Sequence, residues 1–211
     1  MSDLDSRMPR DRQLTAARIL AAAESLITRG GVSAVGINAV AEAAGVDKVL
    51  IYRYFGGRAQ LLRALARARR LWPEIEIPAP SEGEPAALAD DLTAALLAHA
   101  RALRAHPLAR RAAAWQLVER DELARDAAAA RDAQVRAIAT ALRSRHRIPR
   151  FVDLDAMIAL LWAGVTHLAL HGGGGGGAPF AGLDLRREEE WSRAERALSR
   201  TIHALLGAGD E

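Results

Sequence analysis

Apolar residues recur every three or four positions through most of this chain, the spacing that places them on one face of an α-helix. In residues 12–29, for example, they form the stripe Leu14, Ala17, Leu20, Ala23 and Ile27. The short segment "PEIEIP" comes nearest to the alternation of a β-strand, and prolines bound it closely. The pattern therefore predicts an all-α protein.

Proline and glycine divide this pattern into nine predicted helices. The segment 153–171 is apolar nearly all round, so we expect it to be buried on several sides. Its most apolar run, residues 156–170, is too short to span a bilayer, and we expect no membrane partner. The predicted helices cover residues 12–29, 37–44, 47–55, 58–72, 85–106, 108–118, 121–146, 153–171 and 188–206.

Two segments of unusual composition interrupt the helices. Residues 73–85, "PEIEIPAPSEGEP", hold four prolines and are typical of a stiff linker between domains. The run "GGGGGGAP" cannot hold regular structure, so we expect a mobile loop there. These breaks predict a flexible arm (1–11), an N-terminal helical domain (12–72), a linker (73–85) and a C-terminal helical domain (86–211).

Residues 37–55 have the spacing of a helix-turn-helix motif. Gly45 stands where a helix end favours a left-handed residue, and Asp47 can cap the next helix. In that second helix Ile51 and Phe55 share an inner face, while Lys48 and Tyr52 share the opposite one. A cation and a phenol on an outward helix face suit contact with DNA phosphates and entry into the major groove.

The charge distribution and the rare residue types support the same location. The net charge is only +3, but residues 1–72 hold 12 basic against 6 acidic side chains, and the rest hold 17 against 20. Lys48 is the only lysine, and Tyr52 and Tyr54 are the only tyrosines. A basic front on an acidic body indicates that the front meets an anion.

Three ordered blocks in residues 12–72 resemble the DNA-binding domain of the tetracycline-repressor (TetR) family of bacterial transcription regulators. They are "RILAAAESLITRGG", "INAVAEAAGV" and "DKVLIYRYFGGRAQLL". The most specific part is Tyr52-x-x-Phe55 followed by Arg58 and Leu61-Leu62. The remainder matches that family only as an all-helical body of suitable length.

The resemblance, together with the outward positions, gives a set of predicted DNA contacts. The chain departs from the family at Gly36, Asn38 and Leu50, where the family often has a hydroxyl or a basic or polar residue. These departures bear on which operator is recognised. The predicted contacts are Gly36, Asn38, Lys48, Tyr52, Arg53, Tyr54 and Arg58.

The resemblance also implies a body that dimerises through its last two helices and holds a pocket for a small molecule. The continuous apolar stripe of residues 188–206 agrees with a four-helix dimer interface. Burial inside a single chain is the alternative for Leu198 and Ile202. The predicted interface residues are Trp191, Leu198, Ile202 and Leu205.

Large or polar-tipped residues on otherwise apolar helices are candidates for the ligand pocket, since such sites combine apolar walls with a few polar groups. An ordinary place in the core is the alternative for each of them. The candidates are His99, Trp115, Gln116, Trp162, Thr166 and His167. We expect a small apolar or amphipathic ligand.

Other chemistry finds little support in the sequence. The chain has no cysteine, and His167 and His171 lack the companion residues of a metal site. The six-glycine run lacks the Gly-Lys-Ser/Thr of a phosphate-binding loop. We therefore expect no catalytic residues, metal or cofactor, and no apolar signal segment is apparent at the N-terminus.

The sequence thus predicts a cytoplasmic homodimer that binds double-stranded operator DNA and represses transcription until a small molecule releases it. One alternative is a regulator of the same fold that lacks ligand control or acts as an activator. A more remote alternative is a helical carrier or enzyme with an incidental basic front.

Overall fold

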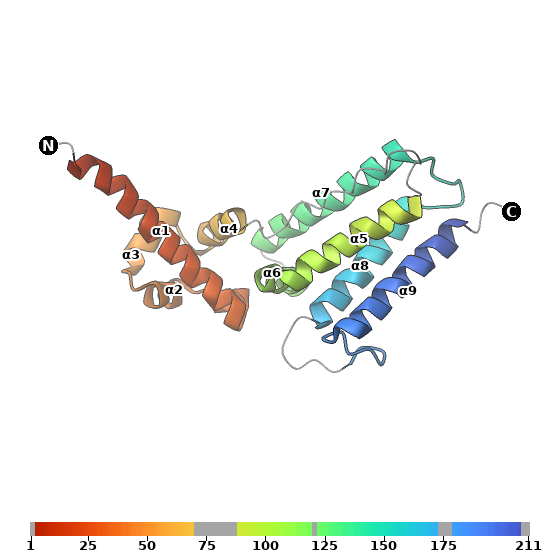
Figure 1. The fold of residues 1–211 in the computed structure, drawn as a ribbon. Helices are drawn as coiled ribbons and strands as arrows, with labels where there is room; N and C mark the ends of the chain where they lie inside the picture. The colour runs from red at the N-terminus through yellow and green to blue at the C-terminus, as the bar shows by residue number, and fades with distance from the viewer. Residues whose placement is uncertain (1–2, 70–87, 120–121, 173–178, 208–211) are drawn as a thin grey trace. The chain divides into compact units, whose positions relative to one another are not determined.

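The computed structural model describes residues 3–69, 88–119, 122–172 and 179–207, and within them the protein is helical (Figure 1). One antiparallel bridge, between Phe180 and Leu183, is the only β-pairing in these ranges. The all-α prediction is confirmed. The predicted linker 73–85 and most of the glycine run lie outside the described residues.

The helices follow the predicted order with small shifts at their ends. A short 3₁₀ turn, Val32–Ala34, precedes the second helix and was not predicted. The first helix begins at Asp3, inside the stretch predicted to be a flexible arm. The helices are α1 (Asp3–Gly30), α2 (Ile37–Ala44), α3 (Lys48–Phe55), α4 (Arg58–Ala68), α5 (Leu88–Ala105), α6 (Pro107–Val118), α7 (Glu122–Arg145), α8 (Leu154–Gly172) and α9 (Glu188–Gly207).

The chain divides into two compact parts, each with its own core. One part, which we term the head, comprises Met1–Trp72 and Arg111–Ala127. The other, the body, comprises Pro73–Arg110 and Ala128–Glu211. The head therefore includes a later segment of chain that the sequence assigned to the C-terminal domain.

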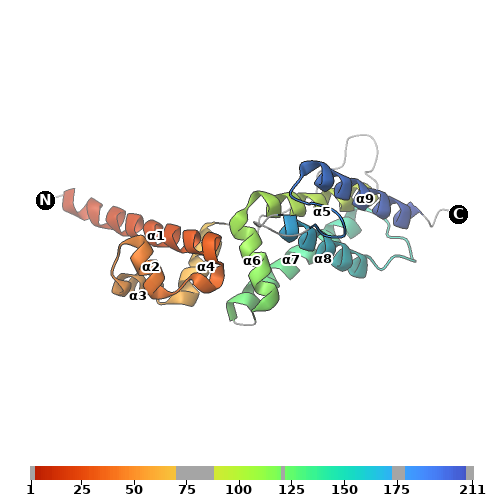
Figure 2. The same cartoon turned by 90° about the horizontal axis from the view of Figure 1, so that it is seen from below.

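In the head, α1 packs against α2 and α4, and α3 packs against both α2 and α4 (Figure 2). Ile19, Val40, Ile51 and Leu65 are fully buried in its core. The stripe predicted for residues 12–29 is only partly correct, because Ala23 and Ile27 are buried whereas Leu14 is 58 % exposed. An ion pair between the Arg69 guanidinium and the Glu24 carboxylate, 2.6 Å apart, joins α4 to α1. This small core fixes how α3 is presented.

In the body, α5 lies beside both α8 and α9 (Figure 1). The carboxylate of Asp91, in the first turn of α5, is buried and lies 2.9 Å from the imidazole of His146, at the end of α7. Gly172 ends α8 where a side chain would not fit, because a Cβ there would lie 2.6 Å from the Leu185 carbonyl oxygen. These contacts fix both ends of the helical layer.

Helix α8 is less enclosed by its own chain than its sequence predicted. Leu154, Ile158, Trp162 and Val165 are buried along one face, whereas Leu160 is 75 % exposed. At 19 residues α8 is also long and apolar enough to cross a membrane by length and composition alone, which corrects the expectation that it is too short. Only 28 % of it is buried, so an apolar face remains uncovered.

Candidate functional site

The turn between α2 and α3 depends on Gly45 and on a hydrogen bond from Arg18. Gly45 adopts a left-handed conformation (φ 62°, ψ 43°) that L side chains rarely adopt. The Arg18 guanidinium, on α1, donates to the Ala44 carbonyl oxygen at 2.7 Å and so satisfies the end of α2. The side chain of Asp47 accepts from the Val49 amide at 2.7 Å and caps α3, as predicted.

Helix α3 presents one buried face and one open face. Ile51 is fully buried, while Lys48, Val49, Tyr52 and Arg53 are exposed. Tyr52 is 53 % exposed, so its hydroxyl is available to an outside partner. The predicted separation of Lys48 and Tyr52 from the inner face is confirmed by this arrangement.

Tyr54 lies at the border of the open face and is half-buried. The Arg12 guanidinium stands over its ring, with the Arg12 carbon Cζ 5.7 Å from the ring centroid. The Phe55 ring lies 6.4 Å away, centroid to centroid. The ring is therefore held between α1 and the end of α3, and it is less accessible than Tyr52.

Arg58 has an internal role that the sequence did not indicate. Its Nε donates to the Val35 carbonyl oxygen at 2.7 Å, and one terminal nitrogen donates to the Val32 carbonyl oxygen at 3.0 Å. Both acceptors belong to the 3₁₀ turn and the loop that lead into α2. Arg58 thus positions the start of α2, where Gly36 and Asn38 are exposed.

Val49, an exposed apolar residue in the first turn of α3, is not among the predicted DNA contacts. It is 62 % exposed. The signal was present in the spacing: two residues at about 100° each place Val49 about 160° around the helix from Ile51. Val49 and Arg53 are therefore the residues most directly opposite the core.

The body places three of the predicted ligand residues together. The rings of His99, on α5, and Trp162, on α8, stack with centroids 3.8 Å apart. The His99 Nε2 atom lies 2.8 Å from the Thr166 hydroxyl oxygen. Burial, and secondarily the positive charge of Arg131, lower the pKa of His99 to about 4, so its imidazole is neutral at pH 7.

This cluster contains a polar atom without a partner. The Trp162 indole nitrogen Nε1 is buried and has no hydrogen-bond partner among the described residues. A buried donor left in this state costs about 1–3 kcal/mol relative to a paired one. The indole N–H could therefore donate to a bound molecule that carries an acceptor.

The other three predicted ligand residues lie elsewhere. Trp115 and Gln116 belong to the head, whereas the cluster of His99 and Trp162 belongs to the body. His167 is exposed, and its ring lies 4.9 Å from that of Phe180. The six candidates are thus not brought together within one compact part.

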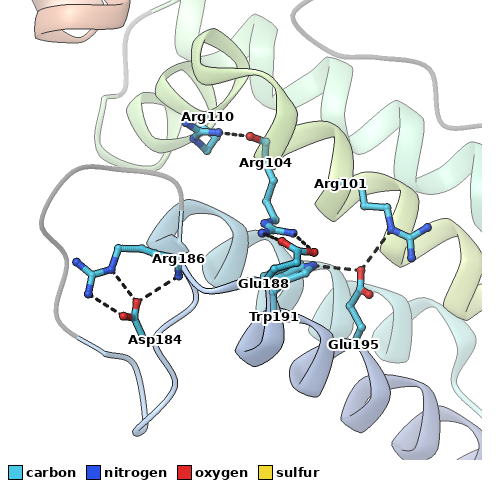
Figure 3. A network of polar contacts seen from close by, with 8 residues as sticks. All are labelled: Arg101, Arg104, Arg110, Asp184, Arg186, Glu188, Trp191 and Glu195. Atoms are coloured by element: carbon cyan, nitrogen blue, oxygen red, sulfur yellow. Dashed lines mark hydrogen bonds and ion pairs between the residues drawn. The ribbon is translucent and has the colours of Figure 1, made fainter.

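The predicted dimer residues divide into two kinds. Trp191 and Ile202 are buried inside the chain, Leu198 is half-buried, and Leu205 is 50 % exposed. The Arg104 guanidinium covers the Trp191 ring, with Cζ 4.4 Å from its centroid (Figure 3). Trp191 is therefore already packed by its own chain.

Polar contacts around Trp191 tie α9 to α5 (Figure 3). The Trp191 indole donates to a Glu195 carboxylate oxygen at 3.1 Å, and Arg101 Nε lies 3.3 Å from the same oxygen. Arg104 also pairs with Glu188 at 2.6 Å, and this bond holds the pKa of that carboxyl below its usual range. The network fixes which face of α9 remains open.

An apolar groove of about 160 Å³ lies between α8 and α9. Leu160, Leu161 and Gly164 of α8 line one side. Trp191, Ala194 and Leu198 of α9 line the other. Glu195 is the only charged residue among those that line it. Within the described ranges, no group of three or more His, Cys, Asp or Glu side chains is arranged to hold a metal ion.

Comparison with known sequences finds a family match within the head. Residues 19–65 match the family described as "Bacterial regulatory proteins, tetR family". Two uncharacterized HTH-type transcriptional regulators of Mycobacterium tuberculosis are each 39 % identical to this chain over 88 residues. The aligned segment spans 41 % of this chain and 44 % of each relative, so the match covers less than half of either protein.

Comparison with solved structures extends the likeness to the whole fold. MexZ, a repressor responsible for antibiotic resistance in Pseudomonas aeruginosa, matches with a TM-score of 0.64 at 22 % identity over 92 % of this chain and 95 % of its own. NalD, the secondary repressor of an efflux pump in the same organism, matches with a TM-score of 0.58 at 20 % identity over 90 % and 96 %. At these identities the likeness concerns the fold alone.

Proposed function

We propose that this chain, which belongs to the tetR family of bacterial regulatory proteins, is a cytoplasmic homodimeric repressor that binds operator DNA and is released by a small molecule. The open face of α3 is the observation that carries this proposal. It presents Lys48, Tyr52 and Arg53 to solvent on a helix whose opposite side is buried. No catalytic role is proposed.

Charge and geometry support DNA as the partner of this face. A single α-helix fits the major groove, and phosphates accept hydrogen bonds from ammonium, guanidinium and phenol groups. Asn38 and the exposed start of α2 lie on the element that precedes the turn, where a helix-turn-helix motif crosses the DNA backbone. Arg58 donates hydrogen bonds to the Val32 and Val35 carbonyl oxygens and so positions the start of α2.

Replacing Lys48 with alanine should weaken operator binding and reduce its salt dependence. Each phosphate contact contributes about 0.9 to the slope of log affinity against log salt concentration, so the slope should fall by roughly one per half-site. Fluorescence anisotropy of a labelled operator duplex between 50 and 200 mM salt, a range of about fourfold, measures the slope.

Arg67, an exposed cation at the end of α4, provides the matched control. Its replacement by alanine removes the same charge away from the open face of α3, so affinity and slope should stay close to wild type. Equal effects of the two variants would assign the binding to non-specific charge and would argue against α3 as the reading element.

The uncovered faces of α8 and α9 support a second copy of this chain as the other partner. An exposed apolar surface of this kind commonly marks a protein interface. A membrane is a poorer occupant, because α9 lines the same groove and carries the exposed cations Arg193 and Arg196. Two copies would bury Leu160, Leu198 and Leu205 and leave those charges in water.

The cluster of His99, Trp162 and Thr166 supports a ligand site in the body. The stacked rings of His99 and Trp162 supply aromatic surface, and the Trp162 indole N–H offers an unused donor. An amphipathic molecule with a hydrogen-bond acceptor fits this chemistry. Such a molecule releases DNA only if it binds the body more tightly in the conformation that does not fit the operator.

An effector bound there should change the fluorescence of Trp162 and release DNA over the same concentration range. Because coupling between two binding sites is reciprocal, saturating operator DNA should weaken effector binding by the same factor. Titrating candidate compounds into wild type and Trp162→Phe, with and without operator, measures both effects. Release of DNA with unchanged affinity in Trp162→Phe would place the effector elsewhere.

The remaining alternatives have separate signatures. A regulator without ligand control would bind its operator under all conditions, and an activator would raise transcription from the adjacent promoter. A carrier or enzyme with an incidental basic front would show no sequence-specific DNA binding. A transcription assay with the operator-bearing promoter distinguishes repression from activation.

A further inference from the structure

The open face of α3 carries an apolar side chain at its centre. Val49 and Tyr52 are the only large hydrophobic residues exposed in α2 and α3, and Tyr52 has a polar tip. Val49 is 62 % exposed and lies between Lys48 and Arg53. A side chain that can neither donate nor accept a hydrogen bond thus stands among the groups that would meet DNA.

The position of Val49 in the first turn of α3 directs it toward bases. In helix-turn-helix proteins the first residues of the second helix contact base edges in the major groove. Val49 lies about 160° around the helix from the buried Ile51, and this direction points straight away from the core.

The backbone amides at the start of α3 are also poorly suited to bind a phosphate. Free amides at a helix N-terminus attract anions, but here the Val49 amide already donates to the Asp47 carboxylate at 2.7 Å. That exposed carboxylate adds a negative charge which repels a phosphate. The Val49 side chain, at the start of α3, is therefore better placed over the groove floor than over the backbone, which the longer Lys48 side chain can still reach.

Only one base offers an apolar partner in the major groove. Thymine presents a C5-methyl group there, whereas the other three bases present only donors and acceptors. The Val49 side chain is stiff about χ1, so little freedom is lost when its methyl groups are packed. We infer that Val49 packs on the C5-methyl group of a thymine in each half-site and makes that base pair a determinant of specificity.

This inference rests on the proposed function, and one series of duplexes tests both. Operators are selected from a library of random DNA duplexes with the wild-type homodimer. Each thymine of the selected operator is then replaced singly by deoxyuridine, which removes only the C5-methyl group. One thymine per half-site should lose about fourfold in affinity, the effect of removing one buried methyl group.

Variants of Val49 test whether this loss of affinity for the deoxyuridine duplex depends on the Val49 side chain. Val49→Ala should bind thymine and uracil equally at this one position and keep wild-type discrimination at the others. Val49→Thr, which retains one methyl group, should give an intermediate ratio. Both changes are at an exposed position, so the fold should survive.

The possible results are distinct. A selection that yields no preferred sequence overturns the proposed function and this inference with it. A preferred operator in which no thymine methyl group depends on Val49 leaves the repressor intact and overturns the role of Val49 alone. Loss of discrimination at every thymine in Val49→Ala would likewise contradict a contact with one base.

Discussion

Leu160→Glu is expected to convert the proposed dimer into a monomer and to weaken specific operator binding strongly. Leu160 is 75 % exposed in the isolated chain and lies on the apolar groove between α8 and α9. In the proposed dimer the new carboxylate would be buried without a partner in both copies. An uncompensated buried charge costs about 3–5 kcal/mol, and each 1.4 kcal/mol weakens association about tenfold.

Sedimentation velocity at micromolar concentration measures this change. The monomer should keep its helical circular dichroism, because Leu160 contributes little to the core of its own chain. Operator affinity should fall by more than about a hundredfold, since one head then binds one half-site without the other. The two effects should appear together.

Leu117→Glu is the matched control for this experiment. Leu117 is a leucine of comparable exposure, 65 %, but it belongs to the head. This variant should sediment as a dimer and bind the operator normally. A Leu160→Glu protein that remains a dimer with wild-type association would show that another surface joins the subunits.

Local sequence signals determined the helix ends that were predicted well. The bounds predicted for α2 were correct because Gly45 adopts the left-handed conformation that such an end requires. Asp47 caps α3 through a contact only two residues away in the sequence. Both features depend on neighbours in the chain, so sequence alone was sufficient.

The start of α1 and the extent of the head depended on information that periodicity lacks. The first residues of α1 carry no apolar stripe, yet a helix already nucleated further along extends at little cost. The inclusion of Arg111–Ala127 in the head depends on contacts such as the 2.9 Å pair between Arg63 and Asp126. Contacts between distant segments leave no periodic signal.

The site residues show the same division. The exposure of Lys48 and Tyr52 was predicted from the sequence, and the outward direction of Val49 could have been found from its two-residue spacing from Ile51. The role of Arg58 could not be predicted from the sequence, because its carbonyl acceptors lie 23 and 26 residues earlier in the chain. Likewise, nothing in the stripe of α9 indicated that Arg104 covers Trp191.

The neutral His99 is expected to make the body sensitive to acid. Its pKa is about 4 in the folded body, against 6.5 for an ordinary histidine, so below pH 6.5 the unfolded chain binds a proton that the folded one does not. The stabilisation is therefore complete above pH 6.5 and is lost as the pH falls toward 4. A difference of this size corresponds to about 3 kcal/mol.

His99→Gln isolates this contribution, because glutamine can still bond to the Thr166 hydroxyl but does not titrate. The quantity to measure is the free energy of unfolding in urea, followed by tryptophan fluorescence at one protein concentration. Wild type should exceed the variant at pH 7.5, and the excess should shrink by about 3 kcal/mol between pH 6.5 and 4.

His203→Gln provides a control in which stability should change with pH in the opposite direction. His203 is mostly exposed, and its hydrogen bonds to the Ser199 carbonyl and then to Asp90 raise its pKa. Its stabilisation is therefore present below pH 6.5 and is lost as the pH rises through its folded pKa, so wild type should gain on this variant as the pH falls. An excess of wild type over His99→Gln that stays constant from pH 7.5 to 4 would mean that folding leaves the pKa of His99 unchanged, so that the imidazole also becomes charged below pH 6.5 in the folded body. That result would contradict the burial of a neutral His99 on which the proposed ligand site depends.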